Sequence, residues 1–316
     1  MIPRLTAAPP PSVRVRAPGK VNLGLRVGPV GDDGYHPLAT IFQAVSLYEE
    51  VTATQVAPGS GISLTVSGPQ ADAVPTDESN LAWRAAALLA ERTGLAADVQ
   101  LHVTKGVPVA GGMAGGSADA AAALVACDAL WEAGMPRPEL VELAAELGAD
   151  VPFSLLGHTA VGTGRGDLLT PAMTRGEFHW CFATQREGLP TPTVFRRFDE
   201  LAGPSTPRVA PTDDTAIMHA LRAGDPVALG KALHNDLEGP ALDLRPELAD
   251  VVEVATESGA LGVVVSGSGP TVAALGRSRQ HALALGAAWT AADVVDAVWC
   301  ATGPAPGTQI VTPMRA

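Results

Sequence analysis

The chain has 316 residues, 47% hydrophobic and 17% charged, which is enough for one large or two ordinary domains with real cores. Its net charge of −12 excludes an extended basic face, so we expect no nucleic-acid partner and expect an anionic ligand to be bound by local donors. The longest uncharged stretch, 258–276, is broken by glycines and a proline, which excludes a membrane span.

Cysteine use and the N-terminus both indicate a cytoplasmic protein. The three cysteines, Cys127, Cys181 and Cys300, form no C-x-x-C pair and are odd in number, as is typical of a reduced compartment. The N-terminal residues lack the apolar core of a signal peptide, and 7–11 form a proline-rich tail. We therefore expect a soluble chain without a membrane partner.

Only three of the 21 basic residues are lysines, namely Lys20, Lys105 and Lys231. Arginine presents a planar fork of donors, whereas lysine presents a compact ammonium. A lysine kept in such an arginine-rich chain therefore marks a candidate site, and chance retention on the surface is the alternative.

The first half of the chain has strand and helix patterns separated by glycine-rich turns. Strands are predicted over 13–16, 21–27, 51–54, 62–67 and 99–104, with a turn at 17–19 and an apolar run over 40–47. Helices are predicted over 80–91, 117–133 and 138–147. Ser79 or Asn80 is expected to cap the first of these helices, and Gly148 to end the third.

The second half restarts with a strand over 180–184, after a tight apolar turn at 148–153 that carries one carboxylate. Helices are predicted over 213–223, 226–233, 246–257 and 280–292, and strands over 263–265, 272–275 and 295–300. Strands and helices intermix without strict alternation, which predicts an α+β fold. We expect two domains, 1–165 and 166–316, with the boundary between 155 and 178.

The glycine-rich loop that precedes the second helix is the clearest chemical motif. It reads Pro108, Val109, Ala110, Gly111, Gly112, Met113, Ala114, Gly115, Gly116, Ser117 and Ala118. Four glycines in six positions leave room for several backbone N–H groups to converge on a polyanion. Ser117 is placed as the N-cap of a helix whose dipole favours an anion. The loop therefore predicts a phosphate site, and a simple tight turn is the alternative.

Two common nucleotide motifs are absent. No lysine stands in a G-x-x-x-x-G-K-[ST] context, and no G-x-G-x-x-G occurs. The sequence therefore supports neither a Walker A enzyme nor a Rossmann dehydrogenase.

Three small-residue loops, 17–22, 108–119 and 266–270, occur in an order and spacing that resemble the GHMP kinases. The resemblance extends over about 15–275. It implies a two-domain fold, with an N-terminal domain like domain 2 of ribosomal protein S5 and a ferredoxin-like C-terminal domain. It also implies transfer of the γ-phosphoryl group of ATP to a small-molecule hydroxyl, with Mg²⁺.

Further motifs resemble one branch of that family, in which the acceptor is a cytidine diphosphate-linked methylerythritol of isoprenoid biosynthesis. These motifs are 31–36, 40–43, 148–152 and 190–195. For this branch the resemblance implies that Tyr35 and Phe195 sandwich the cytosine, while His36 hydrogen-bonds the edge of the base. Gly267, Ser268 and Gly269 are expected on the substrate side of the cleft.

The resemblance also implies roles at the reacting end. Asp150 is expected to accept the proton of the acceptor hydroxyl, and Lys20 to keep Asp150 ionised and to stabilise charge on the oxygen. Asn22 is expected to orient the acceptor. Taken alone, each residue has a plain structural alternative: Asp150 as a helix cap, His36 as a loop histidine and Phe195 as a half-buried aromatic.

The remaining roles implied by the resemblance concern ATP. The glycine loop would bind the phosphates, with the Ser117 hydroxyl holding Mg²⁺, and Asn80 and Lys105 would lie near the adenine. The loop departs from the usual family pattern, because Met113, Ala114 and Ala118 replace a leucine, a glycine and a serine. Asp119 is expected only to complement the helix dipole.

Two other functions remain open from the sequence. A homoserine or mevalonate type of GHMP kinase would share the three loops but would have no use for Tyr35, His36 and Phe195. A nucleotide- or sugar-sensing module would keep the fold without the chemistry, although the presence of both Lys20 and Asp150 argues against it.

Overall fold

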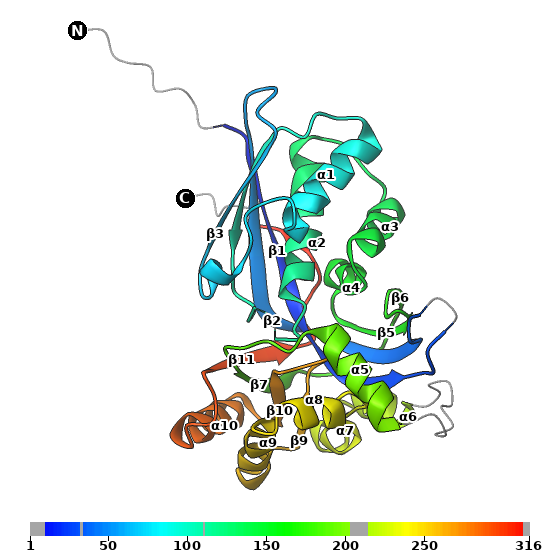
Figure 1. Cartoon of the computed structure of the whole chain (residues 1–316), viewed down its shortest axis with the longest axis vertical. Coiled ribbons are helices and arrows are strands. Elements are labelled where there is room, and N and C mark those ends of the chain that lie inside the picture. Colours follow the sequence, from blue (N-terminus) through cyan, green and yellow to red (C-terminus); the bar gives the residue numbers. More distant parts are fainter. Residues whose placement is uncertain (1–9, 32–33, 110, 203–213, 312–316) are drawn as a thin grey trace, which may run out of the picture.

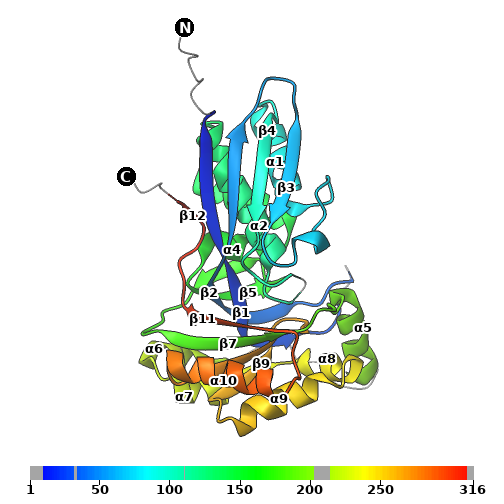
Figure 2. The same ribbon diagram turned by 90° about the vertical axis from the view of Figure 1, so that its left-hand side faces the viewer.

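The computed structural model describes residues 10–31, 34–109, 111–202 and 214–311, arranged around two β-sheets (Figure 1). Ala110 of the glycine loop, residues 32–33, and 7–9 of the predicted tail lie outside the described residues. Each sheet carries helices on one side, and the two sheets meet where the lower ends of β1 and β2 approach β7 and β11 (Figures 1 and 2). The predicted α+β class is confirmed.

The first sheet has the strand order β12-β1-β2-β4-β3, with β5 and β8 added beside β2 and β1 and with β6 beside β5. Its strands are β1 (Ser12–Val27), β2 (Leu38–Gln55), β3 (Ile62–Ser67), β4 (Val99–Thr104), β5 (Thr159–Gly164), β6 (Leu168–Pro171), β8 (His234–Asn235) and β12 (Gln309–Ile310). The short strands β8 and β12 come from the second half of the chain. The division of the chain at 165/166 stays a prediction.

The predicted turn at 17–19 is wrong, because β1 runs through it without a break. The antiparallel register between β1 and β2 shifts between Pro18 and Gly19, and again between Asn22 and Gly24. A β-bulge accommodates a proline inside a strand because the local ladder is already interrupted. The bulge therefore keeps Lys20 and Asn22 on a continuous strand rather than in a loop.

The second sheet has the order β11-β7-β10-β9 and is entirely antiparallel. Its strands are β7 (Phe178–Thr184), β9 (Gly262–Val265), β10 (Val272–Gly276) and β11 (Ala297–Gly303). The helices of this half are α5 (Thr191–Ala202), α6 (Thr215–Ala223), α7 (Pro226–Ala232), α8 (Glu238–Leu244), α9 (Leu248–Glu257) and α10 (Arg279–Ala291). The sequence did not predict α5 or α8, and it gave α9 a start two residues early.

The helices on the first sheet are α1 (Leu81–Thr93), α2 (Gly115–Leu130), α3 (Arg137–Leu147) and α4 (Val151–Leu156), with a 3₁₀ turn at Ala71–Ala73. Asn80 caps α1 as predicted, because its side-chain oxygen accepts a hydrogen bond from Ala82 N at 2.8 Å. Helix α2 is alanine-rich and buried on nearly all sides, since small side chains let it pack closely against the sheet, α1 and α4.

The predicted N-cap at Ser117 is wrong, since α2 begins two residues earlier at Gly115. Ala114 holds the cap position with φ of 60°, and its methyl side chain cannot accept a cap hydrogen bond from the backbone N–H groups. A Cβ on Gly115 would stand 2.9 Å from Glu49 Oε1, so a larger residue there would force the buried carboxyl group to shift. The first turn of α2 therefore presents backbone N–H groups without a side-chain cap.

The two halves share a hydrophobic core between the sheets. Val21, Leu23 and Ile41 of the first sheet pack with Trp180 and Phe182 of β7 in one cluster. The indole of Trp180 also donates a hydrogen bond to Gln43 Oε1 at 2.9 Å. This packed junction fixes the position of the first sheet relative to the second. Over the described ranges, we find no helix with the length and apolar character needed to cross a bilayer.

Candidate active site

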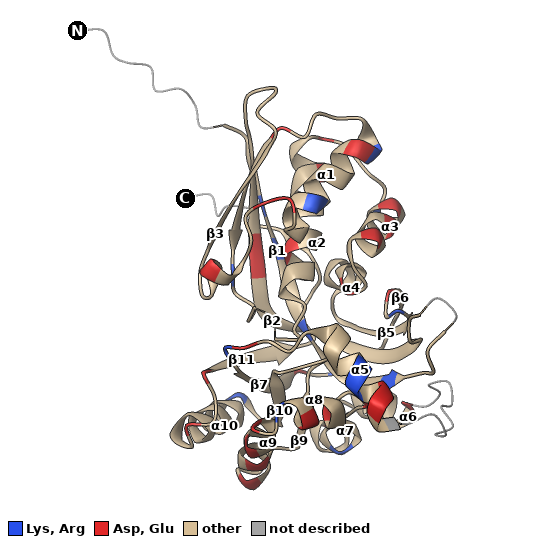
Figure 3. Cartoon of the chain, viewed as in Figure 1, with Lys and Arg blue, Asp and Glu red and all other residues tan. Residues whose placement is uncertain are grey.

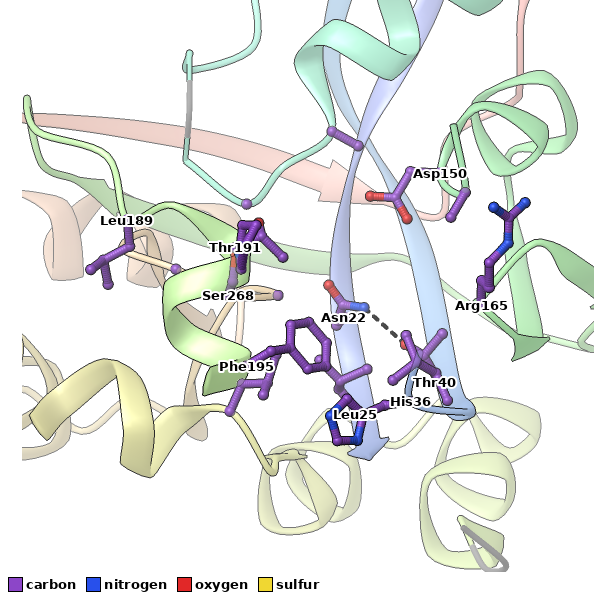
Figure 4. Close-up of a pocket in the computed structure, with 18 of the residues that line it drawn as sticks. Asn22, Leu25, His36, Thr40, Asp150, Arg165, Leu189, Thr191, Phe195 and Ser268 are labelled. Carbon is purple, nitrogen blue, oxygen red and sulfur yellow. Dashed lines mark hydrogen bonds between the residues drawn. The ribbon is translucent and has the colours of Figure 1, made fainter. Parts of the chain in front are cut away.

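A cavity of about 950 Å³ lies where the two halves meet. Figure 4 shows its lining side chains, which come from β1, β2, the start of α4, the start of α5 and the loop after β9. Among its lining residues are Lys20, Asn22, Tyr35, His36, Asp150, Phe195, Gly267, Ser268 and Gly269. The structure thus brings every predicted catalytic and substrate-binding residue to one cavity, although these residues span the chain from 20 to 269.

At one end of the cavity, Lys20 forms a polar cluster with its neighbours. Its ammonium donates to Asn22 Oδ1 at 2.5 Å and to the Gly112 carbonyl at 2.7 Å, and it lies 3.9 Å from Asp150 Oδ2. Burial lowers the pKa of Lys20, and the charge of Asp150 opposes this effect. The Asn22 amide donates in turn to Thr40 Oγ1 at 2.8 Å, which fixes its orientation. A cation, a carboxylate and an oriented amide therefore share one site.

Asp150 occupies the N-cap position of α4 but makes no side-chain cap bond. Its carboxylate points into the cavity instead, toward the position of Asn22 and Thr40 (Figure 4). The interpretation of Asp150 as a plain helix cap therefore lacks the hydrogen bond that would define it. Its role as a base stays a prediction.

The glycine loop forms another wall of the cavity. The lining residues from this loop are Pro108, Gly111, Gly112, Ala114, Gly115, Gly116 and Ser117. A Cβ on Gly112 would lie 2.1 Å from the Ser266 carbonyl oxygen, so this glycine is needed for the close contact between the two loops. Met113 and Ala118 are fully buried, and Val109 is absent from the lining, with its N–H donating to Gln70 Oε1. Their predicted contacts with ATP stay predictions.

Asn80 and Lys105 lie away from this cavity. The Asn80 amide is used locally, since it donates to the Pro75 carbonyl at 2.7 Å and caps α1. The Lys105 ammonium lies 2.7 Å from Glu49 Oε1 and 2.5 Å from Asp119 Oδ2, with all three side chains buried. The expectation that Asp119 only complements the helix dipole is wrong, because it pairs with Lys105. Adenine contacts by Asn80 and Lys105 stay predictions.

The buried cluster of Glu49, Lys105 and Asp119 has unusual acid–base properties. Burial, and then the charge of Asp119, raise the pKa of Glu49 to about 8. Burial raises the pKa of Asp119 to about 6 against the pull of Lys105. Burial alone would lower the pKa of Lys105, but the two facing carboxyl groups outweigh it and raise that pKa. The cluster therefore retains the lysine charge and favours a protonated Glu49.

The other end of the cavity is aromatic. Tyr35 and Phe195 both line it, as predicted, but the ring that stacks on Phe195 is His36, with centroids 5.5 Å apart and planes at 25°. His36 Nδ1 lies 2.8 Å from the Gly28 carbonyl, and Nε2 lies 3.3 Å from Asp199 Oδ2. A sandwich of one base between Tyr35 and Phe195 stays a prediction.

The loop after β9 is tied to β8 and α5. The Asn235 amide donates to the carbonyls of Val265 and Gly267, each at 2.7 Å, and Ser268 Oγ lies 2.8 Å from Thr191 Oγ1. The sequence reasoning did not find this bracing, because Asn235 lies about thirty residues from the loop that it holds. Arg165 and Arg196 also line the cavity, and the sequence assigned a role to neither of them. For Arg165 the glycines on either side of it were the only signal.

Comparisons with known proteins identify the family. The description "GHMP kinases N terminal domain" matches residues 80–158, and "GHMP kinases C terminal" matches 217–294. A 4-diphosphocytidyl-2-C-methyl-D-erythritol kinase from Thermobifida fusca is 56% identical over 308 residues, covering 96% of this chain and 99% of the relative. The chain belongs to the GHMP kinase family. The kinase of the same name from Streptomyces coelicolor is 52% identical, and the match covers 92% of this chain and 98% of the relative.

Solved structures agree with this GHMP kinase assignment. A crystal structure of 4-(cytidine 5'-diphospho)-2C-methyl-D-erythritol kinase has a TM-score of 0.76 at 34% identity, covering 92% of this chain and 99% of that one. A homoserine kinase from Cytophaga hutchinsonii has a TM-score of 0.74 at 19% identity. The match covers 98% of this chain and 100% of the homoserine kinase chain. The second likeness shows the shared fold alone. The predicted two-domain GHMP kinase fold is confirmed.

The residues of this GHMP kinase fit a magnesium ion that arrives with a nucleotide. Mg²⁺ in kinases is bound by one or two protein oxygens together with substrate phosphates and water. The cavity is lined by the half-buried Ser117, in the first turn of α2, and by Asp150, so that a hydroxyl and a carboxylate are both available. Within the described ranges, three or more His, Cys, Asp or Glu side chains nowhere gather as they would for a dedicated metal cage. This donor set suits a shared ion rather than a resident one.

Proposed function

We propose that the chain transfers the γ-phosphoryl group of ATP to the 2-hydroxyl of 4-diphosphocytidyl-2-C-methyl-D-erythritol, a step of isoprenoid biosynthesis. One observation carries the proposal: a single cavity joins the Lys20–Asp150 pair to an aromatic end formed by Tyr35, His36 and Phe195. Relatives that carry this enzyme's name at 50–56% identity over nearly the whole chain confirm the predicted activity.

At the reacting end, we assign the proton transfer to Asp150. The acceptor hydroxyl gives its proton to the Asp150 carboxylate while its oxygen attacks the γ-phosphorus, and the bond to the β–γ bridging oxygen breaks to release ADP. Lys20, whose ammonium lies 3.9 Å from Asp150 Oδ2, is placed to stabilise negative charge on the attacking oxygen. Asn22, held by Thr40, is placed to orient the acceptor.

We assign the ATP phosphates to the glycine loop and the first turn of α2. Backbone N–H groups at a helix start carry partial positive charge, and here no side-chain cap competes for them. Ser117 would hold Mg²⁺ at this place, where the ion neutralises phosphate charge. The positive φ of Ala114 gives the loop the turn for which the family pattern uses glycine.

We assign the cytosine to the aromatic end of the cavity. A base stacked on Phe195 would replace or extend the existing His36 contact, and each base–aromatic stack contributes roughly 1–3 kcal/mol. His36 Nδ1 lies against the Gly28 carbonyl oxygen, and Nε2 faces Asp199. We therefore assign the hydrogen bond with the edge of the base to Nε2, in exchange for its contact with Asp199.

The experiment is a coupled assay of ADP release by the purified protein with Mg-ATP and a panel of acceptors. We expect turnover with 4-diphosphocytidyl-2-C-methyl-D-erythritol and none with homoserine or mevalonate. Turnover with homoserine or mevalonate alone would transfer the assignment to another kind of GHMP kinase. ATP binding without turnover on any acceptor would favour a sensing module.

A further inference from the structure

Two cysteine thiols face each other on the second sheet, on the side covered by α10. Cys181 on β7 and Cys300 on β11 are direct partners in the antiparallel register, and their sulfur atoms lie 3.3 Å apart. Both sulfurs are unbonded thiols. Partners in antiparallel strands have Cα atoms about 4.5–5.5 Å apart, which lies inside the range that a disulfide requires. The backbone therefore needs no rearrangement to bring these sulfurs together.

The surroundings give the two thiols different properties. Cys181 is buried, whereas Cys300 is exposed. The hydrogen bond with Cys181 lowers the pKa of Cys300 to about 7 against the opposing effect of partial burial, and the charge of Arg279 adds to the lowering. The shared hydrogen bond and burial raise the pKa of Cys181. One thiol is thus accessible and readily ionised beside a second thiol that stays protonated, the arrangement of a reactive and a resolving cysteine.

Helix α10 makes the space for this pair. A Cβ on Gly286 would lie 3.0 Å from Cys181 Sγ, so a larger residue there would press on the sulfur. Figure 2 shows α10 lying alongside β7 and β11, which places the pair between sheet and helix at an edge that solvent reaches through Cys300. The third cysteine, Cys127, is buried in α2, and burial raises its pKa to about 12.

We propose that Cys181 and Cys300 form a reversible oxidation site, at which a hydroperoxide converts the two thiols to a cross-strand disulfide. The Cys300 thiolate attacks the terminal peroxide oxygen, the O–O bond breaks, and a sulfenic acid forms on Cys300. The leaving alkoxide, or hydroxide in the case of hydrogen peroxide, takes up a proton. The Cys181 sulfur then attacks Cys300 Sγ, the S–O bond breaks, and the Cys181 proton leaves with the oxygen as water. In total, two thiols and one hydroperoxide give one disulfide, one water and one alcohol or second water.

The crosslink would join positions 119 residues apart, so it would restrict the unfolded chain strongly and raise the Tm. It would also fix β7 to β11, the strands that pair with the first half through Trp180–Gln43 and Thr302–Ser46. Neither thiol lines the cavity, so the proposal stands apart from the proposed function.

The test is peptide mapping by mass spectrometry of the full chain after stoichiometric hydrogen peroxide, with and without later dithiothreitol. We expect a Cys181–Cys300 crosslinked peptide, a higher Tm, and return of both thiols on reduction. Sulfinic acid at Cys300, a disulfide between two copies, or two unchanged thiols would each overturn the proposal.

Two variants separate the steps. Cys181→Ser should halt the reaction at the Cys300 sulfenic acid, trapped with dimedone, while Cys127→Ser should form the disulfide like the wild type. Cys181 is in the core, so Cys181→Ser could unfold the chain. Cys300→Ser changes an exposed position instead, and it should leave Cys181 unoxidised. Oxidation of Cys181 in that variant would show that Cys300 is not the reactive thiol.

Discussion

The Asp150 side chain decides how the reacting end works. It stands at the start of α4 without capping the helix and faces the buried ammonium of Lys20 at 3.9 Å. A carboxylate that lacks a structural bond and shares a cavity with a cation is free to accept a proton. The backbone of α4 fixes its position, since Pro152 in the first turn of α4 sets the geometry of the helix start.

Replacing Asp150 by asparagine should lower kcat by about 10²–10⁴-fold, since an amide of the same shape cannot take the proton. The Kd for ATP should stay close to the wild-type value, because the glycine loop is untouched. Steady-state ADP release and calorimetric titration of the nucleotide check the two expectations. Asp250→Asn on the exposed face of α9 is the matched control. Wild-type turnover in D150N would show that another group accepts the proton.

At the level of elements, Lys105 joins β4, β2 and α2 in one buried contact. It lies just beyond β4 and meets Glu49 of β2 and Asp119 in the first turns of α2. Glu49 also accepts a hydrogen bond from the Gly106 N–H at 2.9 Å and lies under Gly115, where α2 begins. The cluster therefore fixes the helix start that forms one wall of the cavity.

Lys105→Met should lower the free energy of unfolding by about 3–5 kcal/mol, because two buried carboxyl groups would lose their cation. Urea denaturation followed by circular dichroism measures the change. Lys231→Met removes the same group from an exposed position on α7 and should stay within about 0.5 kcal/mol of the wild type. Equal stability of the two variants would show that the buried cluster contributes nothing to the fold.

Glu49 should make stability depend on pH. Its pKa is about 8 in the folded chain against 4.5 ordinarily, so the folded state binds this proton more tightly than the unfolded state does. The stability that comes from this bound proton is fully present below pH 4.5, and it is lost as the pH rises toward 8. Glu49→Gln has no such proton to lose. Between pH 5 and pH 8 its free energy of unfolding should therefore rise by about 1–3 kcal/mol relative to that of the wild type.

Urea titrations at those two pH values test this expectation. Glu50→Gln, on the opposite face of the same strand and paired with Arg14, is the control that should show no such gain. A gain of equal size in both variants would attribute the effect to overall charge rather than to the burial of Glu49.

The sequence predicted those elements whose signals are local. The cap at Asn80, the end of α3 at Gly148 and the glycine loop all follow from neighbours in the chain. The continuous β1 was missed because a bulge opposite Tyr48, a tertiary feature, accommodates Pro18. The pairing of Lys105 with Glu49 and Asp119 was missed for the same reason, since periodicity gives no distance between strands and helices.

The site residues were predicted by motif rather than by pattern. Lys20, Asp150 and Phe195 carry no local signal that would unite them, and the resemblance to the GHMP kinases placed them together before any fold was known. What the motifs could not give is their present contacts, such as the stacking of His36 on Phe195 or the Lys20–Gly112 bond. These contacts depend on how the two sheets meet.

At the scale of the whole molecule, a chain with a net charge of −12 is proposed to bind two ligands that are both anionic. Figure 3 shows acidic and basic segments interspersed along the ribbon, without a continuous basic face in this view. Among the described residues, the lysine and arginine side chains that line the cavity are those of Lys20, Arg165 and Arg196. Backbone donors and these few cations must therefore carry the binding, which makes affinity sensitive to ionic strength.

A ligand that spans the junction should stabilise the two halves together. We expect CDP at about 100 times its Kd to add roughly 2.7 kcal/mol to the free energy of unfolding and to raise the Tm of a single transition. Pyrophosphate at the same concentration should give a smaller rise in the Tm, because it lacks the base.

Phe195→Ala should weaken CDP binding by roughly 1–3 kcal/mol, because the base loses its stacking partner. Leu201→Ala, at an exposed position on the same helix, should leave CDP binding unchanged. Equal shifts with CDP and pyrophosphate would place the phosphates, and not the base, in control of recognition.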